Sequence, residues 1–491
     1  MMYRDTTSCR REVASARFMM SLLISFLLFH GAALFFCSRL DANDLGDREL
    51  DGILETASYN NPNIAAAIER VNQARADLKS AASKFGPTVT GAVGAQWNKD
   101  AQSGVVLDPM TGRTVGVMPV GYRNAYNASL SFVQTLYSGG TLTANKRAAG
   151  LALSASMAEG TRVYQNVLNS VRTSYYDCMR ALAQLQVAIE ALNLSQEHLK
   201  QTEALYHAGL VPMGDVLRVK VSVSQGELDR ISAENALNVN WVVLERVVGV
   251  TLPKEQILRP VSGDRTHELE PPVYQAPGDA VGRAFEQRAE IKAYELQRQR
   301  AEQLAKAASG QRLPSLFLEG QTSTADDNFW PGGNDTWYVQ LGLQWTLYDS
   351  GEITSQVEKA KASARELLYQ IDDLNGQVRQ EVVQAELNLR SALTRLEVAE
   401  DQISTAEEDY RIALRRYDAQ VGTNLDVLDA RVSLTDSRTE YVNAVYDIAI
   451  AQSGLIYAMG DDLPPQGLFQ GGEVSEEIMD EMKKGGAADE K

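Results

Sequence analysis

Two stretches of the chain carry apolar residues at alternating steps of three and four, over lengths far beyond those of an ordinary helix. A mean spacing of about 3.5 residues is the heptad seam of a left-handed coiled coil. About sixty residues predict a helix roughly 90 Å long, or three times the thickness of a bilayer's hydrocarbon core. In the second stretch the seam positions are Val357, Ala360, Ala364, Leu367, Ile371, Leu374, Val378, Val382, Ala385, Leu389, Ala392, Leu396, Ala399, Ile403, Ala406, Tyr410, Ala413 and Tyr417.

The first stretch, from about Leu142 to Tyr206, keeps the same register with smaller residues. Cys178 falls in this seam, and we expect it to be a buried thiol. Each long helix ends in a short turn, at residues 208–214 and 419–424, where a glycine is followed by a new helix start. The pattern predicts antiparallel return helices over residues 215–248 and 425–459.

Other segments alternate strictly between apolar and polar residues, which predicts half-buried strands. The clearest runs from Trp337 to Leu347, and weaker ones lie near residues 88–97, 125–136 and 316–322. In the second of these strands Tyr126, Ala128, Leu130, Phe132 and Leu136 share one face.

A soluble sandwich would also alternate, but two features favour membrane strands. Trp337 and Trp345 lie eight residues apart on one face, roughly 26 Å along a strand, like two aromatic girdles beside a lipid-facing band. Strands of about ten residues suit a bilayer crossing. We therefore predict Trp337, Trp345 and Phe132 to be lipid-facing aromatics.

Four strands cannot stand alone in lipid, because their open edges would leave backbone groups unpaired. Two copies would give a barrel of about eight strands, filled by its own side chains, whereas three give about twelve strands and a lumen. The predicted fold is a mixed membrane α/β protein, in which copies that each supply four strands close a β-barrel continued by long α-helical coiled coils; a duct requires three or more copies.

The two halves of the chain are repeats of one another. Residues 136–140, LYSGG, match residues 347–351, LYDSG, at an offset that also places residues 215–217 on 426–428. The expected repeats cover about 51–249 and 278–460, within one region at 43–460. We predict an acidic, disordered tail at 461–491.

The N-terminus reads as an export signal over residues 1–42, since four arginines precede an apolar run that starts at Phe18. Cleavage after Ala42 is favoured, and an uncleaved anchor is the alternative. Lipidation of Cys37 is disfavoured because bulky residues, not a small one, stand before it.

The composition and the motifs of the chain argue against several classes of function. The net charge of −17 argues against nucleic acid as a partner. Three scattered cysteines make neither a disulfide framework nor a zinc site, and no phosphate-loop, zinc-protease or C-x-x-C motif occurs. His198 and His207 lie near a predicted helix tip, where we expect them to be solvated. We predict no metal, no cofactor and no enzymatic activity.

The segment from Arg416 to Ala430, RYDAQVGTNLDVLDA, resembles the turn-and-helix signature of the TolC family of outer-membrane efflux proteins. Residues 347–351 resemble that family's strand-to-helix corner, and the resemblance covers about residues 51–460. It implies a homotrimer in the outer membrane: a twelve-stranded β-barrel, four strands per protomer, continued by a long α-helical coiled-coil barrel in the periplasm. It also implies a periplasmic adaptor docked on the helix tips and an inner-membrane pump, in a tripartite efflux or type I secretion system. The alternative is a soluble periplasmic coiled-coil adaptor or scaffold.

Two sets of candidate site residues follow. Adaptor docking is assigned to the hairpin tips, at Gly209, Leu210, Val421 and Gly422.

The second set is a periplasmic gate at Asp426 and Asp429, which are three apart and share a helix face. Three copies would gather six carboxylates, which attract cations and raise one another's pKa. The other interpretation is that Asp426 caps its helix and Asp429 is solvated. In the first repeat Asp215 is followed by Arg218, so that pair cancels.

Overall fold

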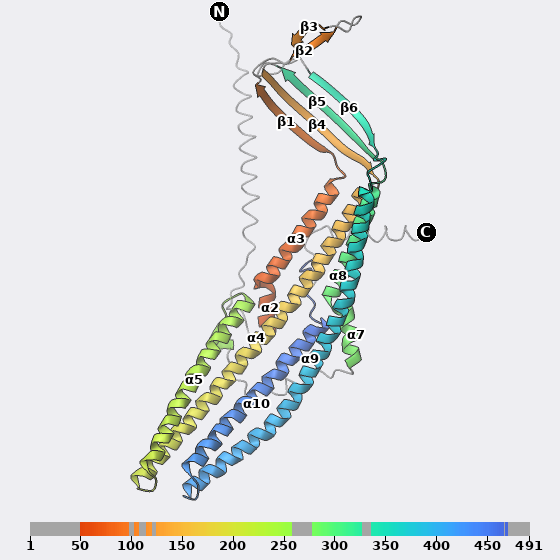
Figure 1. Ribbon diagram of the computed structural model, residues 1–491. Coiled ribbons are helices and arrows are strands. Elements are labelled where there is room, and N and C mark those ends of the chain that lie inside the picture. The colour runs from red at the N-terminus through yellow and green to blue at the C-terminus, as the bar shows by residue number, and fades with distance from the viewer. Residues whose placement is uncertain are drawn as a thin grey trace, which may run out of the picture.

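The computed structural model describes residues 50–97, 103–107, 114–119, 124–257, 277–326, 335–465 and 467–469. The predicted signal at 1–42, including Cys37, lies outside these residues. The molecule is elongated, with a β-sheet at one end and two long helical hairpins at the other (Figure 1). No helix in the described part of the chain is long and apolar enough to cross a bilayer.

The helices and strands follow the predicted repeat. In the first half, α2 (Leu50–Asn60) and α3 (Pro62–Ser83) precede β1 (Thr88–Trp97) and β4 (Asn124–Ser138), which lead into α4 (Thr141–His207) and α5 (Met213–Val248). In the second half, α7 (Pro277–Gln287) and α8 (Ala289–Gly310) precede β5 (Ser315–Asp326) and β6 (Asp335–Gln344), which lead into α9 (Glu352–Asp418) and α10 (Asn424–Met459). A short helix, α6 (Lys254–Ile257), follows α5, and a separate ribbon of β2 (Ser103–Leu107) and β3 (Thr114–Pro119) lies between β1 and β4.

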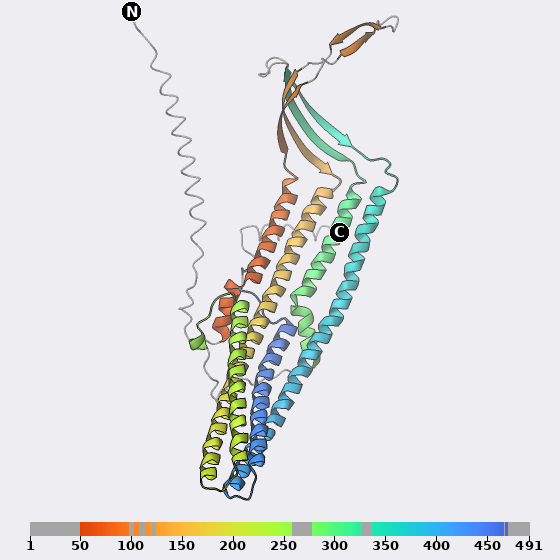
Figure 2. The ribbon, with the colours of Figure 1, turned by 60° about the vertical axis from the view of Figure 1, so that its left-hand side comes forward.

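The main sheet is antiparallel throughout, in the order β1-β4-β5-β6. Helices α3, α4, α8 and α9 all meet the same end of this sheet (Figures 1 and 2). Strands β1 and β5 therefore run away from the helices, and β4 and β6 run back towards them.

The two faces of the sheet differ in polarity, as the alternation predicts. Phe132, Gly320 and Val339 pair in one row across three strands, and a Cβ on Gly320 would come within 2.9 Å of the Phe132 ring. Phe132 therefore shares the exposed apolar face with Val339. On the opposite face Tyr338 and Gln340 both donate hydrogen bonds to Glu319, each at 2.9 Å.

Two details of the strands differ from the simple alternation. A bulge between Thr135 and Tyr137 removes Leu136 from the apolar row and puts Tyr137 opposite Leu316 instead. Strand β6 ends at Gln344, so Trp345 lies just beyond it, and its indole N–H donates to the Arg312 carbonyl at 3.0 Å. Trp345 therefore marks the end of the sheet nearest the helices.

The turn from β4 into α4 depends on close backbone contact. Gly139 has φ 62° and Gly140 has φ 82°, the left-handed region that favours glycine. A Cβ on Gly139 would also come within 2.2 Å of the Gly310 carbonyl oxygen, at the end of α8. The glycine thus lets the two repeats approach where the sheet meets the helices.

The seam predicted for the second long helix is confirmed. Every residue of α9 that is buried belongs to it: Val357, Val378, Val382, Leu389, Ala392, Ala399, Ala406, Ala413 and Tyr417. In α4, Cys178 is fully buried as expected, and burial raises the pKa of its thiol to about 11. Such a thiol stays protonated and contributes packing, not reactivity.

The start of the predicted tail is packed onto the helices. Asp462 receives two hydrogen bonds from the Arg172 guanidinium, at 2.6 and 2.7 Å. The Phe469 ring is buried against Gly160, where a Cβ would come within 2.8 Å of it. A bidentate ion pair and a buried aromatic ring hold residues 462 and 469 against α4, and residues 470–491 of the predicted tail lie outside the described residues.

The polarity of the sheet faces can be tested within β6. Leu341 is 65 % exposed on the apolar face, and Leu341→Arg should impair insertion and assembly, because a cation facing mid-bilayer lipid costs about 2–4 kcal/mol. The matched control is Gln340→Arg on the opposite face, where the new guanidinium can still pair with Glu319. Outer-membrane fractionation and heat-modifiable gel migration measure both. Equal assembly of the two variants would contradict the assignment of faces.

Candidate functional site: the helical tips and the groove above them

The two hairpin tips lie side by side at the end of the molecule farthest from the sheet (Figures 1 and 2). Gly209 turns the first hairpin with φ 74°, and Leu210 beside it is 55 % exposed. In the second tip Val421 is 69 % exposed. Gly422 is tightly placed, because a Cβ there would come within 3.0 Å of the Arg416 side chain and 3.2 Å of its backbone. The predicted tip residues thus present apolar side chains on glycine-dependent turns.

Asp426 and Asp429 both stand exposed at the start of α10. Asp426 completes a capping box with Thr423: its carboxylate accepts from the Thr423 N–H at 3.0 Å, and its own N–H donates to the Thr423 hydroxyl at 3.2 Å. These hydrogen bonds hold the pKa of Asp426 below its ordinary value. A ring of carboxylates, which is expected to raise the pKa of each, needs several copies of the chain. Within one chain, the cap lowers the pKa of Asp426 instead.

The corresponding pair in the first hairpin is neutralised. An Arg218 guanidinium nitrogen lies 3.5 Å from an Asp215 carboxylate oxygen. At the second tip, by contrast, the position of Arg218 is taken by Asp429, so that Asp426 and Asp429 are both acidic.

Above the tips, the two hairpins meet through polar side chains. Arg180 on α4 bonds Asp447 on α10 at 3.0 Å, and Gln184 donates to Asn443 at 2.8 Å. Arg438 on α10 bridges Glu190 of α4 at 3.1 Å and Glu407 of α9 at 3.0 Å.

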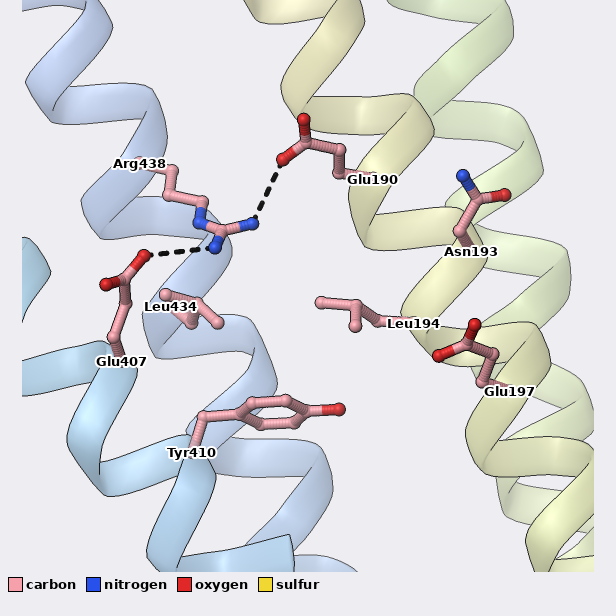
Figure 3. Close-up of a pocket in the computed structure, with 8 residues that line it drawn as sticks. All are labelled: Glu190, Asn193, Leu194, Glu197, Glu407, Tyr410, Leu434 and Arg438. Carbon is pink, nitrogen blue, oxygen red and sulfur yellow. Dashed lines mark hydrogen bonds and ion pairs between the residues drawn. The ribbon is translucent and has the colours of Figure 1, made fainter.

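A groove of about 490 Å³ opens between the hairpins at this level, as Figure 3 shows. Leu194 and Glu197 line it from α4, and Tyr410 and Leu434 line it from the second hairpin. At this level discrete polar contacts surround a hollow between the hairpins, whereas α9 and α10 pack through an apolar seam.

The prediction that His198 is solvated is wrong. It is only 2 % exposed, and its Nε2 lies 2.8 Å from Oδ1 of Asn424, at the second tip. The Asn424 amide nitrogen in turn donates to the Asp215 carbonyl at 3.4 Å. Nearness to a tip suggested solvent, but His198 lies on the side of α4 that faces the other hairpin.

A signal for this burial was present in the sequence. His198 continues the α4 seam at alternating steps of four and three, with Ala191, Ser195 and Thr202, and all four are buried. The ring also makes an edge-on contact with Tyr417, with centroids 5.3 Å apart. His207, by contrast, is exposed as predicted.

Comparison with known proteins decides the family. The model for the family described as "Outer membrane efflux protein" matches residues 53–250 and 280–461, which together span most of the chain and both repeats. The chain belongs to the outer membrane efflux protein family. It is therefore an outer-membrane export channel protein with its helical part in the periplasm, not a soluble adaptor.

The relatives of this efflux protein are distant in sequence but match most of its length. It is 24% identical over 355 residues to the outer membrane protein TolC of Escherichia coli, covering 69% of this chain and 70% of the relative. The structure of VceC from Vibrio cholerae superposes with a TM-score of 0.66 at 21% identity, over 84% of this chain and 96% of the other. A membrane protein from Pseudomonas aeruginosa gives 0.71 at 18% identity, over 84% and 93%. These structures share the fold.

The efflux protein's chemistry is that of a channel family, not an enzyme family. Among the described residues, no group of three or more His, Cys, Asp or Glu side chains is arranged to hold a metal ion. Its candidate functional features are surfaces: the polar face of the sheet, the tips and the interface between hairpins.

Proposed function

We propose that three copies of this chain form one continuous duct across the outer membrane and the periplasm. The observation that carries the proposal is the open sheet: in the described part of the chain, β1 and β6 each have a partner strand on one side only. Unpaired backbone groups in lipid cost several kcal/mol each, by rough estimate, so these edges need partners.

Copies of the same chain suit these edges. Strand β1 runs away from the helices and β6 runs back, so β6 of one copy and β1 of the next would pair antiparallel and continue the alternation around a ring. Three copies give about twelve strands, enough for a lumen, whereas about eight would be filled by side chains. The face with Glu319, Tyr338 and Gln340 would line that lumen.

The trimer is tested by mass. The purified protein in detergent should have about three times the mass of the mature chain, because closure of the barrel requires every edge to be paired. Analytical ultracentrifugation or light scattering with detergent correction measures it. A monodisperse monomer that still conducts ions would contradict the proposal.

We further propose that the tips receive a periplasmic adaptor, which links the duct to an inner-membrane pump of a tripartite efflux or type I secretion system. Exposed Leu210 and Val421, each beside a glycine, allow a helical partner's end to approach closely. The duct itself is passive, and its polar lumen selects cargo by size and charge.

Docking is tested best at Val421. Gly422 is a poor site for substitution, because a Cβ there would lie 3.0 Å from the Arg416 side chain and 3.2 Å from its backbone, so the turn would have to shift to accept it. Val421→Arg should reduce export at least tenfold, because it places a charge at the apolar contact, and should leave the level of trimer unchanged. The matched control is Lys200→Arg, an exposed position on α4 that keeps its charge. Export measured in intact cells at wild-type level in the Val421 variant would argue against docking at the tips.

The gate is proposed at Asp426 and Asp429. In a trimer, the second hairpins would bring six exposed carboxylates to the periplasmic mouth, where they favour cations and hold multivalent ones. The capping role of Asp426 is compatible with this, since its carboxylate is exposed while it accepts the Thr423 N–H.

The gate variant has to remove charge without removing the cap. In Asp426→Asn/Asp429→Asn the new amide oxygen at 426 can still accept from Thr423. Wild type should be cation-selective in planar bilayers and blocked by a trivalent cation added on the periplasmic side, and the double variant should lose most of that block. Asp215→Asn/Arg218→Gln is the matched control and should keep it. Unchanged block in the gate variant would place the gate elsewhere.

A further inference from the structure

We propose that the contact between His198 and Asn424 is an acid-sensitive fastener, which holds the second hairpin against the first at the tips and releases it when His198 is protonated. The inference rests on the proposed duct and adds a regulation to its periplasmic end. Asn424 is the residue through which it acts: it opens α10, is 3 % exposed, and contacts α4 through His198 and α5 through the Asp215 carbonyl.

The hydrogen bonds determine which form of the imidazole fits. Because the Asn424 amide nitrogen donates to Asp215, its Oδ1 is the atom turned towards His198. Oxygen accepts, so His198 Nε2 carries the hydrogen and Nδ1 is the bare nitrogen. Nδ1 is buried and has no hydrogen-bond partner among the described residues. Protonation would therefore place an N–H and a positive charge in a buried site, where the Gln201 side chain is a group that favours the charged ring.

The surrounding groups act in both directions, and the hydrogen bonds with Asn424 and Gln201 favour the charged imidazole. From α9, Asp418 favours the charged imidazole, but it already accepts a hydrogen bond from Gln201 of α4. From α10, Arg431 opposes the charge and is itself bonded to Ser195.

Two further groups face the ring. The Tyr417 ring from α9 contacts it edge-on, and α5 presents the Asp215 carbonyl through Asn424. Burial is the largest influence, and it lowers the pKa of His198 below its ordinary value.

The direction of the pH effect follows from this. Once the hairpins separate, a solvated His198 returns to a pKa of about 6.5 and binds a proton more readily than the buried ring. Lower pH therefore favours separation, starting near that value, and higher pH favours contact. One proton per protomer allows at most about a tenfold change in the equilibrium per pH unit for each fastener.

The architecture above the tips makes such a fastener effective. The hairpins meet there around an open groove and through partly exposed pairs such as Arg438 with Glu190, which contribute little individually. The apolar cluster at the tip is small, with Ala413, Tyr417, Val427 and Ala430 as its buried members. A buried polar contact at the tips can therefore shift the equilibrium between joined and separated hairpins.

The test is channel conductance against pH on the periplasmic side. Wild type in planar bilayers should conduct several-fold more at pH 5.5 than at pH 7.5. His198→Gln keeps an amide donor for Asn424 but does not titrate, so its conductance should be nearly independent of pH over this range. Asn424→Asp would supply a carboxylate that stabilises the imidazolium, and it should suppress the rise. An equal rise in His198→Gln, or none in wild type, would overturn the proposal.

Two controls keep the result interpretable. Asp426→Asn/Asp429→Asn should retain the acid response, which separates the fastener from the gate carboxylates. If His198→Gln fails to assemble, Gln201→Cys/Asp418→Cys, joined by a short crosslinker, tests the same idea: conductance should stay low at pH 5.5 until the link is cut, and a rise in the linked protein would contradict release. A protein that forms no channel at any pH contradicts the duct, whereas a pH-independent channel contradicts only the fastener.

Discussion

Backbone hydrogen bonding in lipid is the constraint on which the rest of this structure depends. A four-stranded sheet with an exposed apolar face satisfies its inner strands but leaves one edge of β1 and one edge of β6 without partners in the described chain. Water can satisfy such edges in solution, but hydrocarbon cannot. The internal repeat meets this constraint. Each repeat supplies one strand that runs away from the helices and one that runs back, so further copies of the chain can continue the same antiparallel alternation.

The helices below the sheet use two kinds of contact for two purposes. Within each hairpin the seam is apolar and closely packed, as the buried residues of α9 show. Between the hairpins polar contacts are added: Arg180, Arg438 and His198 each reach a partner on the other side, while Tyr446 of α10 joins the apolar cluster of α4 around Cys178. Apolar seams hold each hairpin as a rigid unit, whereas the polar contacts nearer the tips surround a groove.

The two repeats differ in the charged and polar residues at their tips. Asp215 is neutralised by Arg218, whereas Asp426 and Asp429 both remain exposed acids. His198 corresponds by repeat to Asp409, and Asn424 to Met213. The buried histidine–asparagine contact between α4 and α10 therefore has no counterpart in the other repeat. The acidic pair occurs only on the second hairpin. This asymmetry places both proposed features of the periplasmic end, the gate carboxylates and the asparagine of the fastener, on the second hairpin.

The sequence by itself determined the elements and their faces, because helix and strand periodicity depend on neighbours a few residues away. The seam of α9, the alternation of β6 and the buried Cys178 could all be read this way, and so could the repeat. The role of Asp426 as a cap was visible as one of two interpretations. The tertiary structure alone decided which faces meet across the hairpins. The contact of His198 with Asn424, the bulge at Leu136 and the packing of Phe469 on Gly160 depend on residues far apart in the chain, and local periodicity carries no information about which distant surface covers a given face.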